Sequence, residues 1–358
     1  MNEKQTYPIA VVGGGPAGME AAGIIAEAGL SVSLFEAKSD WAENLNNKYK
    51  VFPDFTSADD LFKQLNLKID NEQISKYLNT EISGISKNGD LWLLKDSKGN
   101  EYKASAVLLS TGYEVFDAER KEELGYGIYD GVITSLQLEK MLKTQQIKTV
   151  YEEAPQRIVF LQCVGSRDEK TGNRYCSKIC CITAVKQAIE VKKLLPQTEI
   201  FVFYMDLRMW GQNFEELYRE SQEQYNVRYV RGRISEASST FDGRIQIKAE
   251  DTLIGKPLKM STDLLVLMVG MEPSCGTKDL SECCGISGEY GFARSKNPHL
   301  NDNMTDKQGL FVAGSCKRPM SIKETITDAR SAALDIIQRM KNESQLSTLN
   351  SQLLKLST

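Results

Sequence analysis

Short apolar runs alternate with helix-like stretches along the chain, and this alternation predicts an α/β protein. Residues 7–12 form an apolar run typical of a buried parallel strand, and helix-forming residues 19–28 follow them. Gly29 ends that helix, and a second strand is expected over 31–35. The same pattern predicts further strands over 106–113, 157–162, 199–204, 263–269 and 309–313, and helices over 182–195 and 321–341.

The pattern divides into two modules, because the order strand, turn, helix, strand occurs twice. The first module is expected to use residues 1–150 and to resume over 258–340. The second is expected over 155–257, inserted between the two parts of the first. The polar segment 342–358 carries a weak leucine pattern, which indicates a frayed helix or a segment that docks on a partner.

The first module contains the run Gly13-Gly14-Gly15-Pro16-Ala17-Gly18 directly after its first strand. In a dinucleotide-binding turn, Gly13 permits the tight bend, Gly15 lets the backbone approach a pyrophosphate, and Gly18 lets the helix pack on the strand. The helix N-terminus offers free N–H groups and a partial positive charge to the phosphates. Glu36 closes the second strand and can accept hydrogen bonds from a ribose. This order favours a dinucleotide site over an ordinary glycine-rich turn.

Composition excludes several classes of protein. With a net charge of −4 over 358 residues, the chain lacks the basic excess of a nucleic-acid binder. No apolar run is long enough to span a bilayer, and residues 1–6 lack the apolar core of a secretion signal, so a cytoplasmic protein is expected. Its eight cysteines are then expected to be ligands, redox groups or buried thiols. The single histidine, His299, argues against a Ser-His-Asp hydrolase, so a cofactor is expected to supply the chemistry.

The strand-to-helix turn that opens the second module lacks the glycines of the corresponding turn in the first module. Where a nicotinamide-binding module would carry another glycine fingerprint, the chain reads Cys163-Val164-Gly165-Ser166-Arg167. Only one glycine remains, so this turn is not expected to bind NAD(P)H.

Four cysteines occupy this turn and the start of the following helix: Cys163, Cys176, Cys180 and Cys181. If the helix begins at Cys176, then Cys176 and Cys180 lie one turn apart on the same face. Three thiolates near a helix start and a fourth at the strand end could surround a compact iron–sulfur cluster. Helix N–H groups and nearby cations would offset its negative charge, the cations being Arg167, Arg174, Lys178 and Lys186.

Three other interpretations of these cysteines stay open. Zinc usually binds two close cysteine pairs, whereas Cys163 is a lone partner of three crowded thiols. A redox disulfide would lack the Cys-x-x-Cys spacing, and one between Cys180 and Cys181 would be strained. Buried structural thiols are the third alternative.

Two further segments indicate which dinucleotide the first module binds. Thr111-Gly112 ends one buried strand, and Gly314-Ser315 ends another. Both resemble recurring segments of the two-dinucleotide-domain flavoproteins, the Rossmann-type class that includes thioredoxin reductases, and the resemblance implies FAD. That class usually has an acid at the position of Ser315, so the contact to the ribityl chain is expected to be weaker or different. The helix over 321–341 is expected to direct its N-terminus at the flavin, with Ile322 beside the ring.

The chain also resembles the A subunit of heterodisulfide reductase and its relatives in sulfur-oxidising and quinone-interacting complexes. Matching runs lie at 164–169, 175–181, 203–208, 230–233, 266–274 and 309–314. The resemblance implies FAD in the first module and a [4Fe–4S] cluster in the second, bound by Cys163, Cys176, Cys180 and Cys181. It also implies a lysine close to the flavin, matched by Lys186, and a flavin-proximal loop, matched by residues 50–53 with Lys50.

By this resemblance the protein is an FAD-dependent oxidoreductase subunit of sulfur metabolism. Its flavin would exchange two electrons and pass them through the cluster to iron–sulfur and cysteine-rich partner subunits, and the protein would form a homodimer. Two departures are visible: Ala42-Glu43 stand where the family has Gly-Gly, and the chain lacks the ferredoxin-like cysteine runs of the full-length family member. The alternatives are an NAD(P)H-dependent disulfide reductase of thioredoxin-reductase type and a quinone-linked electron-transfer subunit.

Overall fold

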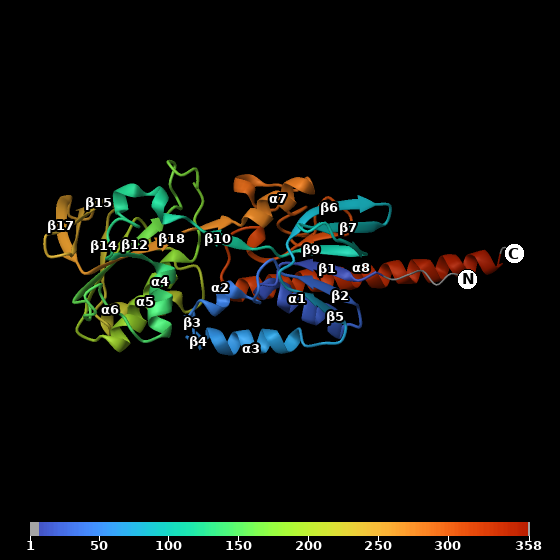
Figure 1. Ribbon diagram of the computed structural model, residues 1–358, viewed down its shortest axis with the longest axis horizontal. Helices are drawn as coiled ribbons and strands as arrows, with labels where there is room; N and C mark the ends of the chain where they lie inside the picture. Colours follow the sequence, from blue (N-terminus) through green and yellow to red (C-terminus); the bar gives the residue numbers. More distant parts are fainter. Residues whose placement is uncertain (1–6, 357–358) are drawn as a thin grey trace. The chain divides into compact units, whose positions relative to one another are not determined.

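The computed structural model describes residues 7–356 and divides the chain into two compact units (Figure 1). Unit 1 comprises Met1–Leu45, Leu61–Glu114 and Pro273–Thr358. Unit 2 comprises Asn46–Asp60 and Val115–Glu272. The expectation for residues 1–6 lies outside the described residues. Two short strands, β10 (Tyr113–Val115) and β19 (Met271–Pro273), carry the chain from one unit to the other.

Unit 1 is built on a five-stranded parallel sheet in the order β20-β9-β1-β2-β5. Val11 of β1 lies between Leu34 of β2 and Leu108 of β9, and all three side chains are buried. A smaller antiparallel sheet, β6-β7-β8, packs its buried residues into the same core. The strands are β1 (Ile9–Val12), β2 (Val32–Phe35), β5 (Ile74–Tyr77), β6 (Ile82–Asn88), β7 (Leu91–Asp96), β8 (Glu101–Ala104), β9 (Ala106–Leu109) and β20 (Leu310–Val312).

Helix α1 (Pro16–Glu27) follows the glycine turn and packs beside α8 (Ile322–Leu356) (Figure 1). A capping box starts α8, since Ser321 Oγ accepts from Glu324 N–H at 3.2 Å and Glu324 accepts from Ser321 N–H at 2.9 Å. The helix predicted over 321–341 is confirmed, and it continues through 342–356 of the predicted tail. The other helices here are α2 (Glu43–Asn46), α3 (Ala58–Lys68) and α7 (Cys275–Cys283). No helix within residues 7–356 is both long and apolar enough to cross a membrane.

Unit 2 repeats the parallel plan with the strand order β11-β18-β12-β13-β14. A separate antiparallel sheet, β15-β16-β17, follows β14 in the chain, and a two-stranded ribbon pairs β3 with β4. The strands are β3 (Lys50–Val51), β4 (Thr56–Ser57), β11 (Val132–Thr134), β12 (Arg157–Val164), β13 (Glu199–Tyr204), β14 (Arg228–Arg231), β15 (Ile234–Ser239), β16 (Ile245–Asp251), β17 (Lys256–Thr262) and β18 (Leu264–Val269). The helices are α4 (Ser135–Lys143), α5 (Cys180–Leu194) and α6 (Phe214–Glu223).

The boundaries of the two units differ from those of the predicted domains. Residues 46–60, 115–150 and 258–272, which were expected in the first module, belong to unit 2. The reason is strand pairing: β18 hydrogen-bonds with both β11 and β12 in the sheet of unit 2. The expectation that residues 263–269 complete the sheet of the first module is therefore wrong. The expectation that residues 309–313 complete the sheet of the first module is confirmed, since β20 pairs with β9 in unit 1.

Candidate functional site

In unit 1, the glycine turn between β1 and α1 leaves open space where a phosphate-bearing ligand would need it. Gly13 has φ +109°, and a Cβ there would lie 2.4 Å from Ser110 O. At Gly18 a Cβ would lie 1.8 Å from Gly13 O, so the helix can pack on the turn only if residue 18 has no side chain. At Gly15 a Cβ would meet nothing within 4 Å, which leaves the backbone accessible. The three glycines therefore have the properties predicted from the fingerprint.

The first turn of α1 also has unused donors. Gly15 is its N-cap and makes no side-chain cap hydrogen bond, and Pro16 stands in the first turn. A helix start without a side-chain cap presents its free N–H groups to whatever lies in front of it. Glu36 accepts hydrogen bonds from the backbone N–H of Gly14 at 2.8 Å and of Lys38 at 2.9 Å. The carboxylate is thus fixed beside the glycine turn, and each oxygen keeps a lone pair for a hydroxyl donor.

The other predicted FAD contacts of unit 1 gather at the same edge of the sheet. A Cβ at Gly13 would lie 3.0 Å from Thr111 N, and one at Gly314 would lie 2.9 Å from Ala17 Cβ. Thr111 Oγ1 is 2.6 Å from Thr277 Oγ1 in α7, which holds the Thr111-Gly112 turn. Ser315 is buried, and Ile322 is the first residue of α8. These residues fit a dinucleotide lying across the carboxyl ends of β1 and β9.

The sequence did not reveal the acid that orders the turn after β20. Gly314 N–H donates to Asp328 Oδ2 at 2.7 Å, and the buried Lys317 ammonium lies 2.7 Å from Asp328 Oδ1. Asp328 comes from α8, fourteen residues away. A carboxylate therefore reaches the strand end beside Ser315, although from another part of the chain than in the flavoprotein pattern.

In unit 2, strand β12 ends in a bulge that redirects Cys163. Its register against β18 shifts between Leu161 and Val164, and Cys163 has φ +60°, in the left-handed region that non-glycine residues rarely adopt. A bulge turns a side chain away from the alternation of the strand. Arg167 and Lys178 also have positive φ, at +54° and +65°. Several strained residues in one loop point to a functional arrangement.

Helix α5 begins at Cys180, with Ile179 as its N-cap. The start considered at Cys176 is therefore wrong: Lys178 has a left-handed backbone that cannot continue a helix, and Cys176 lies in the preceding loop. Ser177 anchors this loop, because its Oγ accepts from Met271 N–H at 2.9 Å. Cys180 and Cys181 remain in the first turn of α5, and the loop brings Cys176 to them.

The four thiols lie close enough to affect one another. Burial raises the pKa of Cys180 well above its ordinary value, and the neighbouring Cys163, Cys181 and Cys176 raise it further. Burial likewise raises the pKa of Cys163 to about 12, a rise that the Arg167 guanidinium opposes. Cys163, Cys180 and Cys181 are 4–6% exposed. Burial therefore disfavours the thiolate forms of Cys163, Cys180 and Cys181, and a bound cationic cluster would counteract this.

Two residues at the end of β12 and in the loop after it have unsatisfied polar atoms. Both amide atoms of Gln162 and Nη1 of Arg167 are buried without a hydrogen-bond partner among the described residues. Buried atoms of this kind mark the position of an absent ion or group. Within residues 7–356, no three His, Cys, Asp or Glu side chains are placed to hold a metal ion, so the sulfurs do not converge on one point. Four neighbouring thiols are the donor type that iron–sulfur clusters take.

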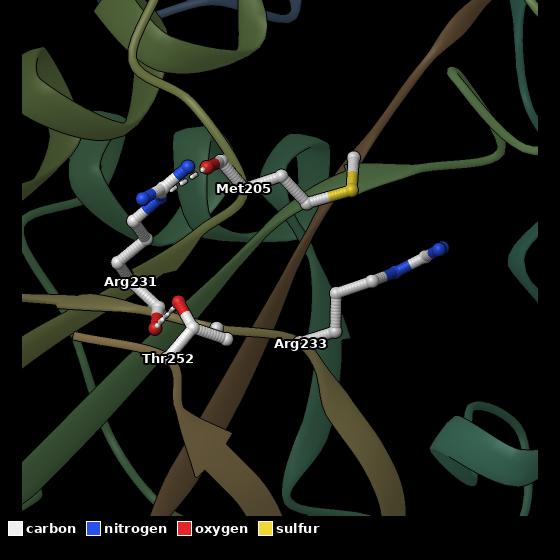
Figure 2. A pocket seen from close by; sticks show the side chains of 5 residues that line it. Met205, Arg231, Arg233 and Thr252 are labelled. Atoms are coloured by element: carbon white, nitrogen blue, oxygen red, sulfur yellow. Dashed lines mark hydrogen bonds between the residues drawn. The ribbon is translucent and has the colours of Figure 1, made fainter. Parts of the chain in front are cut away.

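A pocket of about 310 Å³ opens beyond β13 and β14, lined by Met205, Arg231, Gly232, Arg233 and Thr252 (Figure 2). Arg231 Nε donates to Met205 O at 3.3 Å, and Thr252 Oγ1 donates to Arg231 O at 2.9 Å. Asp206, next to Met205, is the acid of this region. Its ion pair with Arg167, together with the charges of Arg208 and Arg231, holds its pKa below the usual range. The carboxyl ends of β13 and β14 are therefore rich in arginine.

Lys186 in α5 is buried rather than solvated. Its Nζ forms an ion pair with Glu139 of α4 and donates to Lys50 O at 2.8 Å. Glu139 also accepts from Tyr49 N–H at 3.0 Å and from Gln187 Nε2 at 2.7 Å. Burial lowers the pKa of Lys186, although Glu139 opposes this. The structure thus brings Lys186 and Lys50, which were predicted separately as flavin-proximal, together within unit 2, and it adds Glu139, which no sequence motif had indicated.

The sequence of the chain is similar to a known protein family and to several curated proteins. Residues 7–159 match the family model described as pyridine nucleotide-disulphide oxidoreductase. The chain is 39% identical over 241 residues to the A subunit of the H2/formate:CoB-CoM heterodisulfide,ferredoxin reductase of Methanococcus maripaludis. That match covers 64% of this chain and 36% of the relative. The iron-sulfur A subunit of CoB--CoM heterodisulfide reductase from Methanocaldococcus jannaschii is 39% identical over 250 residues, covering 66% and 38%.

Among solved structures, thioredoxin reductase of T. acidophilum matches 94% of this chain and 99% of its own, with a TM-score of 0.68 and 16% identity. The predicted two-dinucleotide-domain fold is confirmed by this likeness. The predicted resemblance to the A subunit of heterodisulfide reductase is also confirmed, and the prediction of an oxidoreductase agrees with the family model. This chain spans little more than a third of the length of the curated relatives that it matches.

Proposed function

Because the chain is a relative of the A subunit of heterodisulfide reductase, we propose that it is an electron-transfer subunit that binds FAD in unit 1 and a [4Fe–4S] cluster in unit 2. One observation carries this proposal: four cysteines gather between the end of β12 and the start of α5, where a nicotinamide module would have its glycine cradle. The match to the oxidoreductase family ends at residue 159, just before that turn.

In unit 1 the chain would bind FAD with the residues that meet at the carboxyl edge of the sheet. The free N–H groups of the α1 start would hold the pyrophosphate, and Glu36 would accept from a ribose hydroxyl. The other proposed contacts are those of the turns after β9 and β20 and of the start of α8, namely Thr111, Gly112, Gly314, Ser315 and Ile322. A bound flavin supplies conversion between two-electron and one-electron transfer.

In unit 2 the chain would hold the cluster with Cys163 from the bulge, Cys176 from the loop, and Cys180 and Cys181 from the first turn of α5. The loop residues would exclude water from it, since three of the four thiols are almost fully buried. Lys186 keeps the role that the resemblance implies, a cation that favours reduced flavin. Two of its three N–H groups already have acceptors, Glu139 and Lys50 O, so one remains for a further partner.

Partner subunits carrying iron–sulfur centres, a second copy of the chain and a place in sulfur metabolism belong to the same proposal. The names of the relatives support the partner subunits, since they describe A subunits of CoB-CoM heterodisulfide reductases. The thioredoxin-reductase alternative has less support, because the turn after β12 has no cradle for a nicotinamide dinucleotide.

The alternative and the proposal give different results with NADPH. The protein, purified anaerobically with its cofactors, is mixed with NADPH and then with dithionite while the flavin absorbance is followed. We expect NADPH to leave the flavin oxidised and dithionite to bleach it. Rapid bleaching by NADPH would overturn the proposal and support a self-contained disulfide reductase.

A further inference from the structure

Arg167 lies inside the loop that gathers the four cysteines, and the loop fixes its backbone. Its φ is +54°, and its N–H donates to Tyr175 O at 2.9 Å. The side chain is 20% exposed, and Nη2 donates to Asp206 Oδ2 at 2.5 Å. Nη1 is buried and has no nitrogen or oxygen acceptor among residues 7–356, while the guanidinium forms a hydrogen bond with the Cys163 thiol. The guanidinium is thus anchored by Asp206 on one side and lies against a sulfur on the other.

Nη1 belongs to a group that lies among sulfur atoms. Arg167 forms a hydrogen bond with Cys163, and its ion-pair partner Asp206 contacts Cys181 through its backbone O at 3.8 Å. A buried guanidinium N–H without a nitrogen or oxygen acceptor costs free energy. A sulfur-containing anion held by these cysteines would supply the acceptor.

The backbone of Asp206, the ion-pair partner of Arg167, contacts one of the same cysteines. Cys181 Sγ lies 3.8 Å from Asp206 O, and Arg208 N–H donates to Cys181 Sγ at 3.4 Å. The Asp206 side chain is 45% exposed, so its charge is partly screened, whereas the charge of Arg167 is mostly enclosed. The ion pair therefore adjoins the sulfur set through the guanidinium of Arg167 and through the backbone of Asp206.

We propose that Arg167 is a positioning residue that donates Nη1–H to the sulfur group of the cysteine set and, balanced by Asp206, sets its reduction potential. This inference rests on the proposed function, because it requires the cluster. Reduction adds one negative charge to a cluster, and hydrogen bonds to the sulfurs and local charge determine its potential. Arg167 stabilises the reduced form, and Asp206 opposes it.

The test is a redox titration of the cluster signal, followed by electron paramagnetic resonance, in the protein with its cofactors. Arg167→Gln removes the charge and is expected to lower the potential. Asp206→Asn leaves the charge of Arg167 unbalanced and is expected to raise it. Each shift should reach about tenfold in the reduction equilibrium, which is about 59 mV for one electron. Arg233→Gln, in the neighbouring pocket, is the matched control and should change the equilibrium by much less.

Opposite signs are the decisive feature. If the ion pair only held the loop, both variants would shift the potential in the same direction or leave it unchanged, and either result overturns the inference. If Arg167→Gln fails to retain iron, Asp206→Asn decides alone, and a potential that does not rise overturns the inference. A wild-type protein without iron contradicts the proposed function itself, so the two failures are distinguishable.

Discussion

Lys186 and Glu139 form an ion pair whose side chains are only 3% and 2% exposed. Removal of one partner leaves the other charged and buried, which typically costs about 3–5 kcal/mol. We therefore expect Lys186→Met to lower the free energy of unfolding by about that amount, measured by urea denaturation. The double variant Lys186→Met with Glu139→Leu should recover much of the loss, because it leaves no buried charge unpaired. A double variant as unstable as the single one would contradict this account of the pair.

Two substitutions at Cys163 distinguish the effect of its strained backbone on stability from the effect of losing its thiol. Both Cys163→Gly and Cys163→Ala remove the sulfur, but only glycine adopts φ +60° without strain. In iron-free protein we expect the glycine variant to be more stable than the alanine variant by about 1 kcal/mol, since the left-handed conformation costs other residues about 1–2 kcal/mol. Urea denaturation of both variants measures the difference. Equal stability would mean that the backbone at 163 is not strained.

Ala42 stands where the resemblance implies glycine, and it has φ +49° with its N–H bonded to Gly14 O at 2.9 Å. The conformation that glycine favours is thus retained by a residue that disfavours it. We expect Ala42→Gly to raise the free energy of unfolding by about 0.5–1 kcal/mol, the relief of strain less the added freedom of the unfolded chain. The control is Ala22→Gly in the buried part of α1, which should lower stability by about 1 kcal/mol. A loss in both variants would contradict the prediction.

Asp302 gives a dependence of stability on pH. Burial works to raise its pKa, but Arg318 and Lys317 outweigh this and hold it at about 2, against an ordinary value of 3.8. Because the folded-state pKa is the lower one, the stabilisation is present above pH 3.8 and is lost as the pH falls toward 2. After screening at this partly exposed site, the contribution is at most about 1 kcal/mol. Unfolding free energies from pH 6 to 3 should therefore fall less steeply for Asp302→Asn than for the wild type, and identical slopes would contradict this assignment.

Local features of the fold were predictable where a residue has few conformational choices. The turn at Gly13 and Gly18 was predictable because a Cβ at either position would clash with backbone atoms, so only glycine fits there. Strand β18 was placed in the wrong sheet because an apolar run indicates a buried parallel strand and not which of two similar sheets receives it.

The cysteines of the candidate site were found from their spacing, whereas several of its other features were not. The redirection of Cys163 comes from a bulge, and Glu139 and Asp206 meet the site only through contacts with distant segments. Sequence spacing cannot locate such partners, because only the folded chain brings them together.

The central claim is that unit 2 carries an iron–sulfur cluster in place of a nicotinamide site. Iron and flavin counts on anaerobically purified protein test it most directly, in the wild type and in Cys176→Ser, with the exposed Cys283→Ser as the matched control. We predict one FAD and about four irons per chain in the wild type and the control, and loss of iron with retention of FAD in Cys176→Ser. Full iron retention in Cys176→Ser, or a wild-type protein that binds FAD without iron, would contradict the account.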